Sequence, residues 1–580
     1  MESAEIQGGT ATAGAPGRRR RWPLALVLLL GLLVQLPTLR VGFFADDYAQ
    51  QLVLAGERGP VPVPRWNLYD FGTAEEWRAF GAEHEGLPWW TGSDWKVRFF
   101  RPLTSLTLVA DHALWGSDAR GYHATSLLLW LALLVVAHRL YLALGLAPRA
   151  AMAALLVLAL SDASAIPVGW IANRNALLEA LLAAGAVLAA LRGRAGVAIL
   201  LGVAAALSKE SGALVFPVVA WVLWRAGRAR PASGALALLA VHVAFLALAG
   251  YGTRSLFYAT PWSDPGRFLA NLGVLATGGV LSLLGPVPLD VVTIAPLARV
   301  VLVALGLLAG WPLWRWILRR VPEGSARTLA AGWTVLFLLP QASAPPSDRL
   351  LLVPVVGAAA LLGAAWSAER ARWRELARPA RLGRLALAAS ATLGSGLYLL
   401  AHNLDVLPGM ANHLRAKALA TEVGPPAPRR EVLVLQSENH MQAFTLGATW
   451  HAEIADESVR FSVLHGGPRA LRWTRTGERE LTLESLGAPF LDTPFEYVYR
   501  TDPEPPAVGT RWRASWFEVE AVAADAAGLR AFRVILDRSL DDPSLRFVRP
   551  IEGVLSLIAP PALGASLDLP AAIPTRPFMP

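Results

Sequence analysis

Long apolar runs separated by short polar turns constrain this chain more than any other feature of its sequence. The first of them, residues 22–39, reads WPLALVLLLGLLVQLPTL. Runs of about 17–25 apolar residues are long enough to cross the hydrocarbon core of a bilayer as helices. Only 17% of the residues are charged, against roughly 25% in soluble domains, and the mean hydropathy is +0.42. The sequence therefore predicts a polytopic α-helical membrane protein.

The arginines indicate which ends of these helices face the cytoplasm. The formal charge is +9, but the basic residues gather between apolar runs and not on one continuous surface. Short loops rich in Arg are typical of the cytoplasmic side, so the charge reports topology and predicts no nucleic-acid partner. We expect a multi-pass protein of the bacterial inner (plasma) membrane with a cytoplasmic N-terminus. The tracts that support this are residues 18–21, 192–194, 225–230, 315–320 and 370–384.

Eleven crossings place every Arg-rich tract on the cytoplasmic side. The segment 101–116 has helical spacing but carries Asp111 and His112, so we expect it at the membrane interface. Residues 268–285 are treated as a re-entrant or interfacial segment, with a further span as the alternative. The expected spans are 22–39, 122–144, 150–166, 174–191, 195–208, 212–225, 233–250, 294–316, 328–343, 350–367 and 385–401.

The chain divides into four parts on this interpretation. A cytoplasmic tail (1–21) precedes a membrane domain (22–401), which contains a large outer loop with an acidic motif (41–121). A Pro-rich linker (402–430) then leads to an extracytoplasmic domain (431–580) that we expect to be β-rich or α+β. Its expected strands are EVLVLQ, VRFSVL, RELTLES, FEYVYR, RWRASWFEVEAV and LRAFRVIL.

Two adjacent carboxylates, Asp46 and Asp47, follow the first predicted helix in the stretch VGFFADDYAQ. Other ionisable residues fall in the outer loops of the same topology. Ionisable groups at membrane depth indicate a functional site, and this mixture suits an anionic lipid-linked substrate together with a polar acceptor. The further outer residues are Asp162, Arg174, Lys209, Glu210, Asp348 and Arg349.

Five blocks in this order resemble the GT-C superfamily of glycosyltransferases that use polyprenyl-phosphate sugars. The closest similarity is to the transmembrane tetratricopeptide-repeat O-mannosyltransferases and their bacterial relatives, although no tetratricopeptide pattern is present. Ser126 and Trp130 occupy positions where that family has Asn and His, and SDASAIP replaces its usual residues before Arg174. The blocks are FADDY, FRPLTSLTLVADHALWGSDARGYHATSLLLW, PVGWIANRNALLEALL, ALSKESGALVFP and SDRLLLVPVVG.

The resemblance implies transfer of a sugar from a polyprenyl phosphate to an acceptor hydroxyl, with inversion, on the periplasmic face. A general base takes the acceptor proton, and the family favours Asp46 over Asp47. Cations stabilise the leaving phosphate, for which Lys209, Arg349 and Arg174 are the candidates. The alternatives for Lys209 and Arg349 are local ion pairs with their sequence neighbours. Supporting roles fall to Arg101, His123, Glu210 and Asp348.

Metal, partners and other functions stay open at this stage. No His-rich metal motif appears and the chain has no Cys, although a divalent cation between Asp46 and the phosphate is possible. The acceptor is a protein, a glycan or a lipid. A flippase or transporter for a lipid-linked glycan predicts charged residues inside spans and inverted repeats. A non-catalytic envelope scaffold predicts that the C-terminal domain, and not the aspartates, carries the function.

Overall fold

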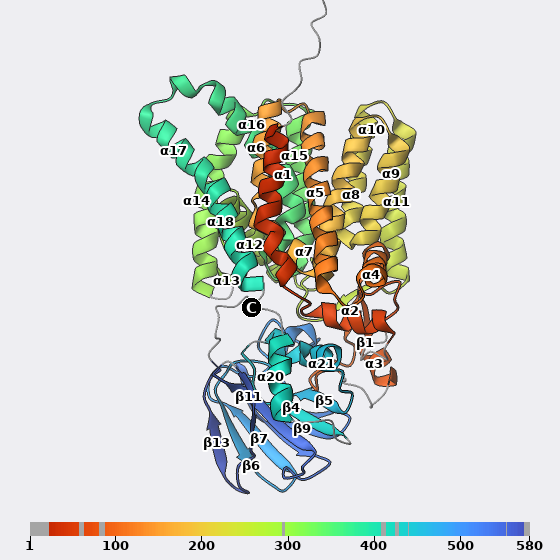
Figure 1. Ribbon diagram of the computed structural model, residues 1–580, viewed down its shortest axis with the longest axis vertical. Coiled ribbons are helices and arrows are strands. Elements are labelled where there is room, and N and C mark those ends of the chain that lie inside the picture. Colours follow the sequence, from red (N-terminus) through yellow and green to blue (C-terminus); the bar gives the residue numbers. More distant parts are fainter. Residues whose placement is uncertain are drawn as a thin grey trace, which may run out of the picture.

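A helical membrane domain and a strand-rich C-terminal domain lie end to end in the computed structural model (Figure 1). The structure describes residues 22–56, 63–80, 87–292, 296–407, 413–423, 429–438, 440–552 and 554–572. The predicted cytoplasmic tail, 1–21, lies outside the described residues. The mostly helical membrane architecture with a β-containing second domain confirms the predicted fold class.

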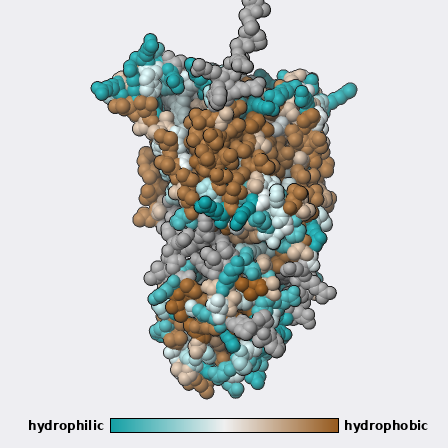
Figure 2. Space-filling model, viewed as in Figure 1, coloured by the Kyte–Doolittle hydropathy of each residue, from teal (hydrophilic) through white to brown (hydrophobic). Residues whose placement is uncertain are grey.

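Among the described residues, seven helices are long and apolar enough to cross a membrane, or eight if one bent pair counts as a span. Their apolar side chains form the broad hydrophobic band of Figure 2, with hydrophilic atoms above and below it. They correspond to seven of the eleven predicted crossings. The seven are Pro23–Arg40, Ala119–Ala143, Ile171–Leu191, Ala229–Leu248, Pro296–Arg320, Asp348–Arg370 and Arg378–Val406.

The other four predicted spans are shorter or broken. Helix α6 (Pro148–Ala159) bends by 58° into the segment Asp162–Gly169, so the span expected at 150–166 is a bent pair, which is either one broken span or a re-entrant loop. The polar SDAS sequence explains the break. Within it, the Ser164 hydroxyl donates to the Ser161 carbonyl oxygen at 2.7 Å, a local hydrogen bond that competes with continuation of the helix. The remaining three are α9 (Ala195–Ser208), α10 (Val215–Arg225) and α15 (Ser325–Leu338).

The residues before and after helix α12 (Pro265–Ser282) form hydrogen bonds with the same segment of the chain, residues 343–348. Before it, the Ala259 amide donates to the Ser343 carbonyl oxygen at 2.8 Å. After it, the amide of Leu289, at the start of α13 (Leu289–Val292), donates to the Asp348 carboxylate at 2.9 Å. The chain therefore enters and leaves this region on one face, as a re-entrant segment does.

The outer loop expected at 41–121 is a folded layer between the two domains. It contains α2 (Asp46–Ala55), β1 (Asp70–Thr73), α3 (Ala74–Phe80), β2 (Lys96–Arg98) and α4 (Pro102–Trp115). Strand β3 (Gly252–Arg254), from a later loop, pairs with β2 and completes a small antiparallel sheet in the order β1-β2-β3. This layer carries the acidic motif at its N-terminal end, on α2.

Two sheets and two helices form the C-terminal domain. The six-stranded antiparallel sheet has the order β13-β6-β7-β10-β9-β8, and the four-stranded mixed sheet has the order β12-β11-β4-β5. Helices α20 (His413–Val423) and α21 (His440–Ile454) pack against each other and α20 also packs against β12. The strands are β4 (Arg430–Val434), β5 (Val459–Val463), β6 (Leu471–Arg475), β7 (Glu480–Ser485), β8 (Arg511–Arg513), β9 (Phe517–Asp525), β10 (Gly528–Leu536), β11 (Leu545–Ile551), β12 (Val554–Ile558) and β13 (Ser566–Leu569).

Two predictions about this domain are wrong. FEYVYR is not a strand, because its carbonyl oxygens accept amides from the outer loops: Phe257 donates to Tyr497 at 3.0 Å and Gly92 to Tyr499 at 2.9 Å. The region 402–430 is not simply a linker, because α20 lies within it and buries Leu419 and Val423 in a core shared with β4 and β5. Residues 424–428 of that region lie outside the described residues.

Tryptophans of the outer loop fix the two domains together. Trp89 and Trp90 are buried in the core of the C-terminal domain, together with residues of its two sheets. Their indole N–H groups donate to the carbonyl oxygens of Leu464 at 3.2 Å and Glu496 at 3.3 Å. Trp95 donates in the same way to Val498 at 2.7 Å. We call these three residues the tryptophan anchors; they hold the C-terminal domain over one end of the helical bundle.

Candidate active site

A cavity of about 2010 Å³ lies between the helical bundle and the C-terminal domain. Its wall combines residues of the bundle, the outer layer and the C-terminal domain, and nine of its charged residues are basic against five acidic. Sites for one small ligand usually measure roughly 300–1,000 Å³, so this cavity has room for two reactants. The sequence-predicted residues Asp46, Arg101, Lys209, Glu210 and Arg349 all lie on its wall.

Asp46 and Asp47 are the first two residues of helix α2, but their carboxylates have different surroundings. Asp47 is buried, and its carboxylate accepts the amides of Phe44 at 3.1 Å and Ala172 at 2.7 Å. Asp46 lines the cavity, and no described residue forms a hydrogen bond or ion pair with its carboxylate. The structure therefore offers one carboxylate of the pair to a ligand.

The backbone before Asp46 is strained. Ala45 has φ 52° and ψ −126°, in a region that favours glycine, and its side chain is buried. Such a conformation costs on the order of 1–3 kcal/mol and persists only where the surroundings enforce it. Here it turns the chain so that α2 starts with one carboxylate toward the cavity and the next toward the protein interior.

Burial and the neighbouring cations act in opposite directions on these carboxyl groups. Burial raises the pKa of Asp46 above its ordinary value, while Arg349 and then Arg101 lower it. For Asp47, burial raises the pKa to about 8, although the backbone amides of Phe44 and Ala172 oppose the rise. A carboxylate whose pKa is raised toward neutrality is a stronger base than an ordinary exposed aspartate.

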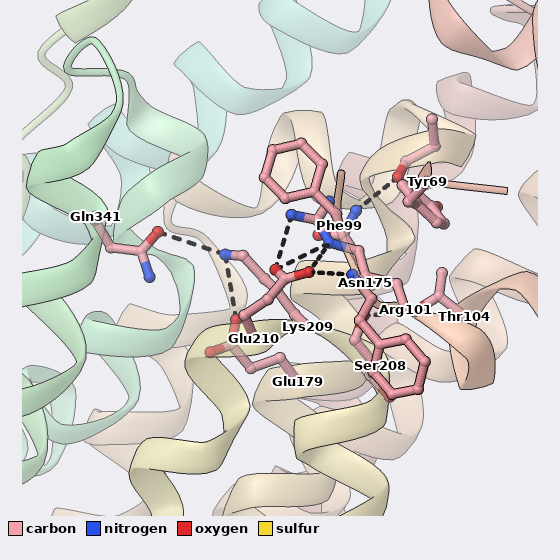
Figure 3. Close-up of polar contacts among 12 residues, drawn as sticks. Tyr69, Phe99, Arg101, Thr104, Asn175, Glu179, Ser208, Lys209, Glu210 and Gln341 are labelled. Carbon is pink, nitrogen blue, oxygen red and sulfur yellow. Dashed lines mark hydrogen bonds and ion pairs between the residues drawn. The ribbon is translucent and has the colours of Figure 1, made fainter. Parts of the chain in front are cut away.

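Lys209 lies just after α9, where the chain turns into the 3-10 helix η4 (Glu210–Leu214). Its Nζ is 3.2 Å from Oε2 of Glu179 and 3.4 Å from Oε1 of Gln341, as Figure 3 shows. Glu179 is fully buried on helix α8 (Arg174–Leu191). The expected alternative, a pair with Glu210, is therefore wrong, and the ammonium balances a buried carboxylate at the edge of the cavity.

Glu210 pairs with Arg101 instead. The Arg101 guanidinium approaches the Glu210 carboxylate at 3.0 Å and lies 4.3 Å above the Phe99 ring (Figure 3). Glu210 also accepts the backbone amide of Phe100 at 2.9 Å. This pair ties the outer layer to the turn that carries Lys209, which is a supporting role of the kind that the resemblance implied.

Arg349 is a cation of the bundle that lines the cavity. Its guanidinium lies 5.3 Å from the centre of the Trp170 ring, and Trp170 in turn stacks on Phe44 at 5.4 Å. No described residue forms an ion pair or hydrogen bond with Arg349. The alternative of a local pair with Asp348 is wrong, because Asp348 is buried and accepts the amide of Leu289.

Four of the predicted site residues lie outside the cavity wall: Asp47 and Asp348, described above, and Arg174 and His123. Arg174 is fully buried, and its guanidinium donates to Asp111 at 2.5 Å, to Tyr122 O at 2.7 Å and to Ser126 Oγ at 3.1 Å. His123 is also fully buried, with Nε2 3.0 Å from the carbonyl oxygen of Gly42. These contacts hold helices α4 and α5 (Ala119–Ala143) to the start of α8, so the prediction that Arg174 faces a phosphate is not supported by its position.

The sequence did not single out several residues that the structure brings to the site. Tyr258, Asp290 and Tyr499 line the cavity, and Glu179 partners Lys209. Asp290 belongs to the re-entrant region and Tyr499 to the misassigned strand, so neither carried a motif signal. Among the described residues, no group of three or more His, Cys, Asp or Glu side chains could hold a metal ion.

Comparison with known proteins gives matches only at the level of structure. No family model and no curated protein matches the chain. The chain is similar to the crystal structure of ArnT from Cupriavidus metallidurans bound to undecaprenyl phosphate, at 13% identity and a TM-score of 0.42, over 76% of this chain and 86% of that one. It is also similar to the archaeal oligosaccharyltransferase AglB from Archaeoglobus fulgidus, in complex with an inhibitory peptide and a dolichol-phosphate, at 13% identity and a TM-score of 0.44, over 76% and 64% of the two chains.

Proposed function

We propose that this chain is a membrane glycosyltransferase that moves a sugar from a polyprenyl-phosphate donor to an acceptor hydroxyl, with inversion, on the face that carries the C-terminal domain. That face is the periplasmic one if the Arg-rich turns are cytoplasmic. The observation that carries the proposal is a pair of groups on one cavity wall, the Asp46 carboxylate and the Arg349 guanidinium, that have no hydrogen-bond or ion-pair partner in the part of the chain that the structure describes.

Asp46 is the general base in this proposal. The acceptor oxygen attacks the anomeric carbon from the side opposite the phosphate, and its proton passes to the Asp46 carboxylate as the new C–O bond forms. The bond between the anomeric carbon and the phosphate oxygen breaks, and its electron pair leaves with the lipid phosphate. General-base assistance of this kind is worth about 10²–10⁴-fold in rate.

Arg349 and Lys209 receive the negative charge that grows on the leaving phosphate. A guanidinium presents a planar fork to two phosphate oxygens, and the stacked Trp170 fixes its plane. Of the three donors of the Lys209 ammonium, two are directed at Glu179 and Gln341, so the third can contact a phosphate without releasing the buried carboxylate. Preorganised cations are often the largest contribution to catalysis of such a transfer.

Arg174, Asp47 and His123 are assigned structural roles in this proposal. Each has its polar groups directed at the protein interior, and none lies on the cavity wall. Asp47 fixes the first turn of α2 against Ala172, which places Asp46. Arg101 with Glu210 fixes the turn before η4, which places Lys209.

Transfer by purified protein tests the proposal directly. The protein in lipid nanodiscs is given a labelled polyprenyl-phosphate hexose, with free hexoses or short Ser- and Thr-containing peptides as acceptor probes, and both lipid phosphate and labelled product are measured. Asp46→Asn should reduce transfer about 10²–10⁴-fold without changing thermal unfolding.

Asp118→Asn is the matched control. Asp118 is exposed and caps the N-terminus of α5, where Asn caps equally well, so this variant should keep full transfer. Transfer by Asp46→Asn equal to that of Asp118→Asn would show that Asp46 is not the base. No release of lipid phosphate by the natural protein with any of these donors would overturn the proposed function.

A further inference from the structure

The C-terminal domain forms the side of the cavity away from the helical bundle. Residues of α21, including Ala443, Phe444 and Ala448, and residues of the segment 491–517 belong to the wall. Helix α21 packs directly against α2, and Tyr48 of α2 donates to Glu453 of α21 at 3.4 Å. The candidate base Asp46 therefore faces a wall that a soluble domain, and not a membrane helix, supplies.

Tyr499 is a residue of this wall that is held on several sides. Its ring stacks on Trp95, with centroids 5.8 Å apart and an interplanar angle of 22°, and packs on Phe444 at 5.3 Å. Its carbonyl oxygen accepts the amide of Gly92, and its own amide donates to the carbonyl oxygen of Glu496 at 3.2 Å. One tryptophan anchor and the C-terminal domain thus hold the ring in place.

The hydroxyl group of Tyr499 has no such partner. Tyr499 lines the cavity, and among the described residues no hydrogen bond is made by its Oη. Two residues earlier, the hydroxyl of Tyr497 donates to Asp492 at 2.9 Å, and Tyr497 is not on the cavity wall. The segment therefore contains one satisfied tyrosine hydroxyl and one that is free to meet a ligand.

Tyr499 also lies within electrostatic reach of the candidate base. Burial, and then the charge of Asp46, raises the pKa of Tyr499, which keeps the hydroxyl protonated and able to donate. A rigidly held donor that faces a carboxylate across a cavity defines a place for a polar group between them. The phosphate-binding candidates Arg349 and Lys209 come from the bundle, so this place belongs to the other reactant.

We propose that Tyr499 of the C-terminal domain is an acceptor-binding residue, which hydrogen-bonds the hydroxyl-bearing acceptor and positions it for proton removal by Asp46. The inference rests on the proposed glycosyl transfer and adds a residue from outside the membrane domain to that site. The C-terminal domain is then part of the active site and contributes to the choice of acceptor. No new chemical step is required, since Tyr499 holds its proton throughout.

Tyr499→Phe tests the inference, with Tyr497→Phe as the matched control. Both variants lose one hydroxyl from the same segment and keep the aromatic ring and its packing. Using whichever hexose or peptide probe the natural protein glycosylates fastest, Tyr499→Phe should raise the acceptor KM about 2- to 10-fold, the usual effect of one lost hydrogen bond. The donor KM and the slow release of lipid phosphate to water should stay unchanged, and thermal unfolding should match the control.

The two hypotheses fail in different ways. Natural protein that transfers sugar, with Tyr499→Phe and Tyr497→Phe indistinguishable in acceptor KM, would overturn the inference alone. The inference would also be overturned if Tyr499→Phe changed the donor KM and the release of lipid phosphate to water as much as the acceptor KM. Tyr499 would then act on the fold of the site and not on the acceptor. Absence of any transfer by the natural protein would remove the proposed function and this inference with it.

Discussion

Replacement of Lys209 by Met tests two roles of its charge: neutralisation of the buried Glu179 carboxylate and the proposed contact with the donor phosphate. Glu179 is fully buried, and neither of its carboxylate oxygens has a hydrogen-bond partner among the described residues. The compensating charge is the Lys209 ammonium, 3.2 Å away. Removal of one partner from a buried ion pair costs about 3–5 kcal/mol, because the other charge is left uncompensated. We therefore expect Lys209→Met to lower the free energy of unfolding by about that amount.

The double variant Lys209→Met with Glu179→Gln removes both charges. Most of the lost stability should return, since the buried carboxylate that needed a counter-charge is gone. Transfer should not return. A lost hydrogen bond to a charged phosphate costs about 1.5–3 kcal/mol, so transfer should stay about 10- to 100-fold below that of the natural protein.

Thermal unfolding in nanodiscs and single-turnover transfer at saturating donor measure the two effects independently. Glu179→Gln alone is the control: it leaves the Lys209 ammonium, whose side chain is 15% exposed at the cavity edge, so it should lose less stability than Lys209→Met and should keep transfer. If the double variant regains full transfer, Lys209 only neutralises Glu179 and does not contact the donor phosphate. If Lys209→Met unfolds like the natural protein, the argument from the buried charge is wrong.

Two further substitutions test other parts of the site. Transfer needs ionised Asp46, so its rate increases with pH as that carboxyl loses its proton. Arg349 lowers the pKa of Asp46, so Arg349→Gln should move this acid limb of the pH–rate profile to higher pH. An acid limb that does not move would contradict the electrostatic coupling between Arg349 and Asp46. Arg174→Gln should destabilise the protein by about 3–5 kcal/mol, because buried Asp111 loses its partner. The donor KM of the folded Arg174→Gln variant should stay unchanged. A donor KM raised tenfold would instead support a role for Arg174 in binding the donor phosphate.

The sequence was most informative where physical constraints are local. Apolar length and the placement of Arg predict seven of the eleven spans well, because crossing a bilayer requires both an unbroken apolar run and satisfied backbone groups. At 150–166 the apolar length did not reveal the bend, because the few polar residues of SDAS decide between a straight and a bent helix. Alternating apolar residues located most of the strands but also suggested a strand at FEYVYR, whose backbone bonds to distant loops.

For the site, the sequence could indicate which residues gather at one face but not what each of them contacts. The topology predicts that Asp46, Lys209 and Arg349 share one face of the membrane, and the structure adds that all three line one cavity. The partners differ from those that sequence proximity suggested: Lys209 meets Glu179, Glu210 meets Arg101, and Asp348 meets Leu289. Each of these contacts joins segments far apart in the chain, and such tertiary pairings have no signature in a single sequence.

The tryptophan anchors impose an order on the assembly of this protein. Trp89 and Trp90 belong to a core whose other members extend to Leu569, so these residues leave the ribosome hundreds of residues before their packing partners exist. During synthesis at roughly 5–20 residues per second, the outer layer must wait for tens of seconds with large apolar side chains uncovered. The wall of the candidate site is complete only when the segment 491–517 has joined that core. A chain that terminates early would therefore leave Trp89 and Trp90 uncovered at the membrane surface.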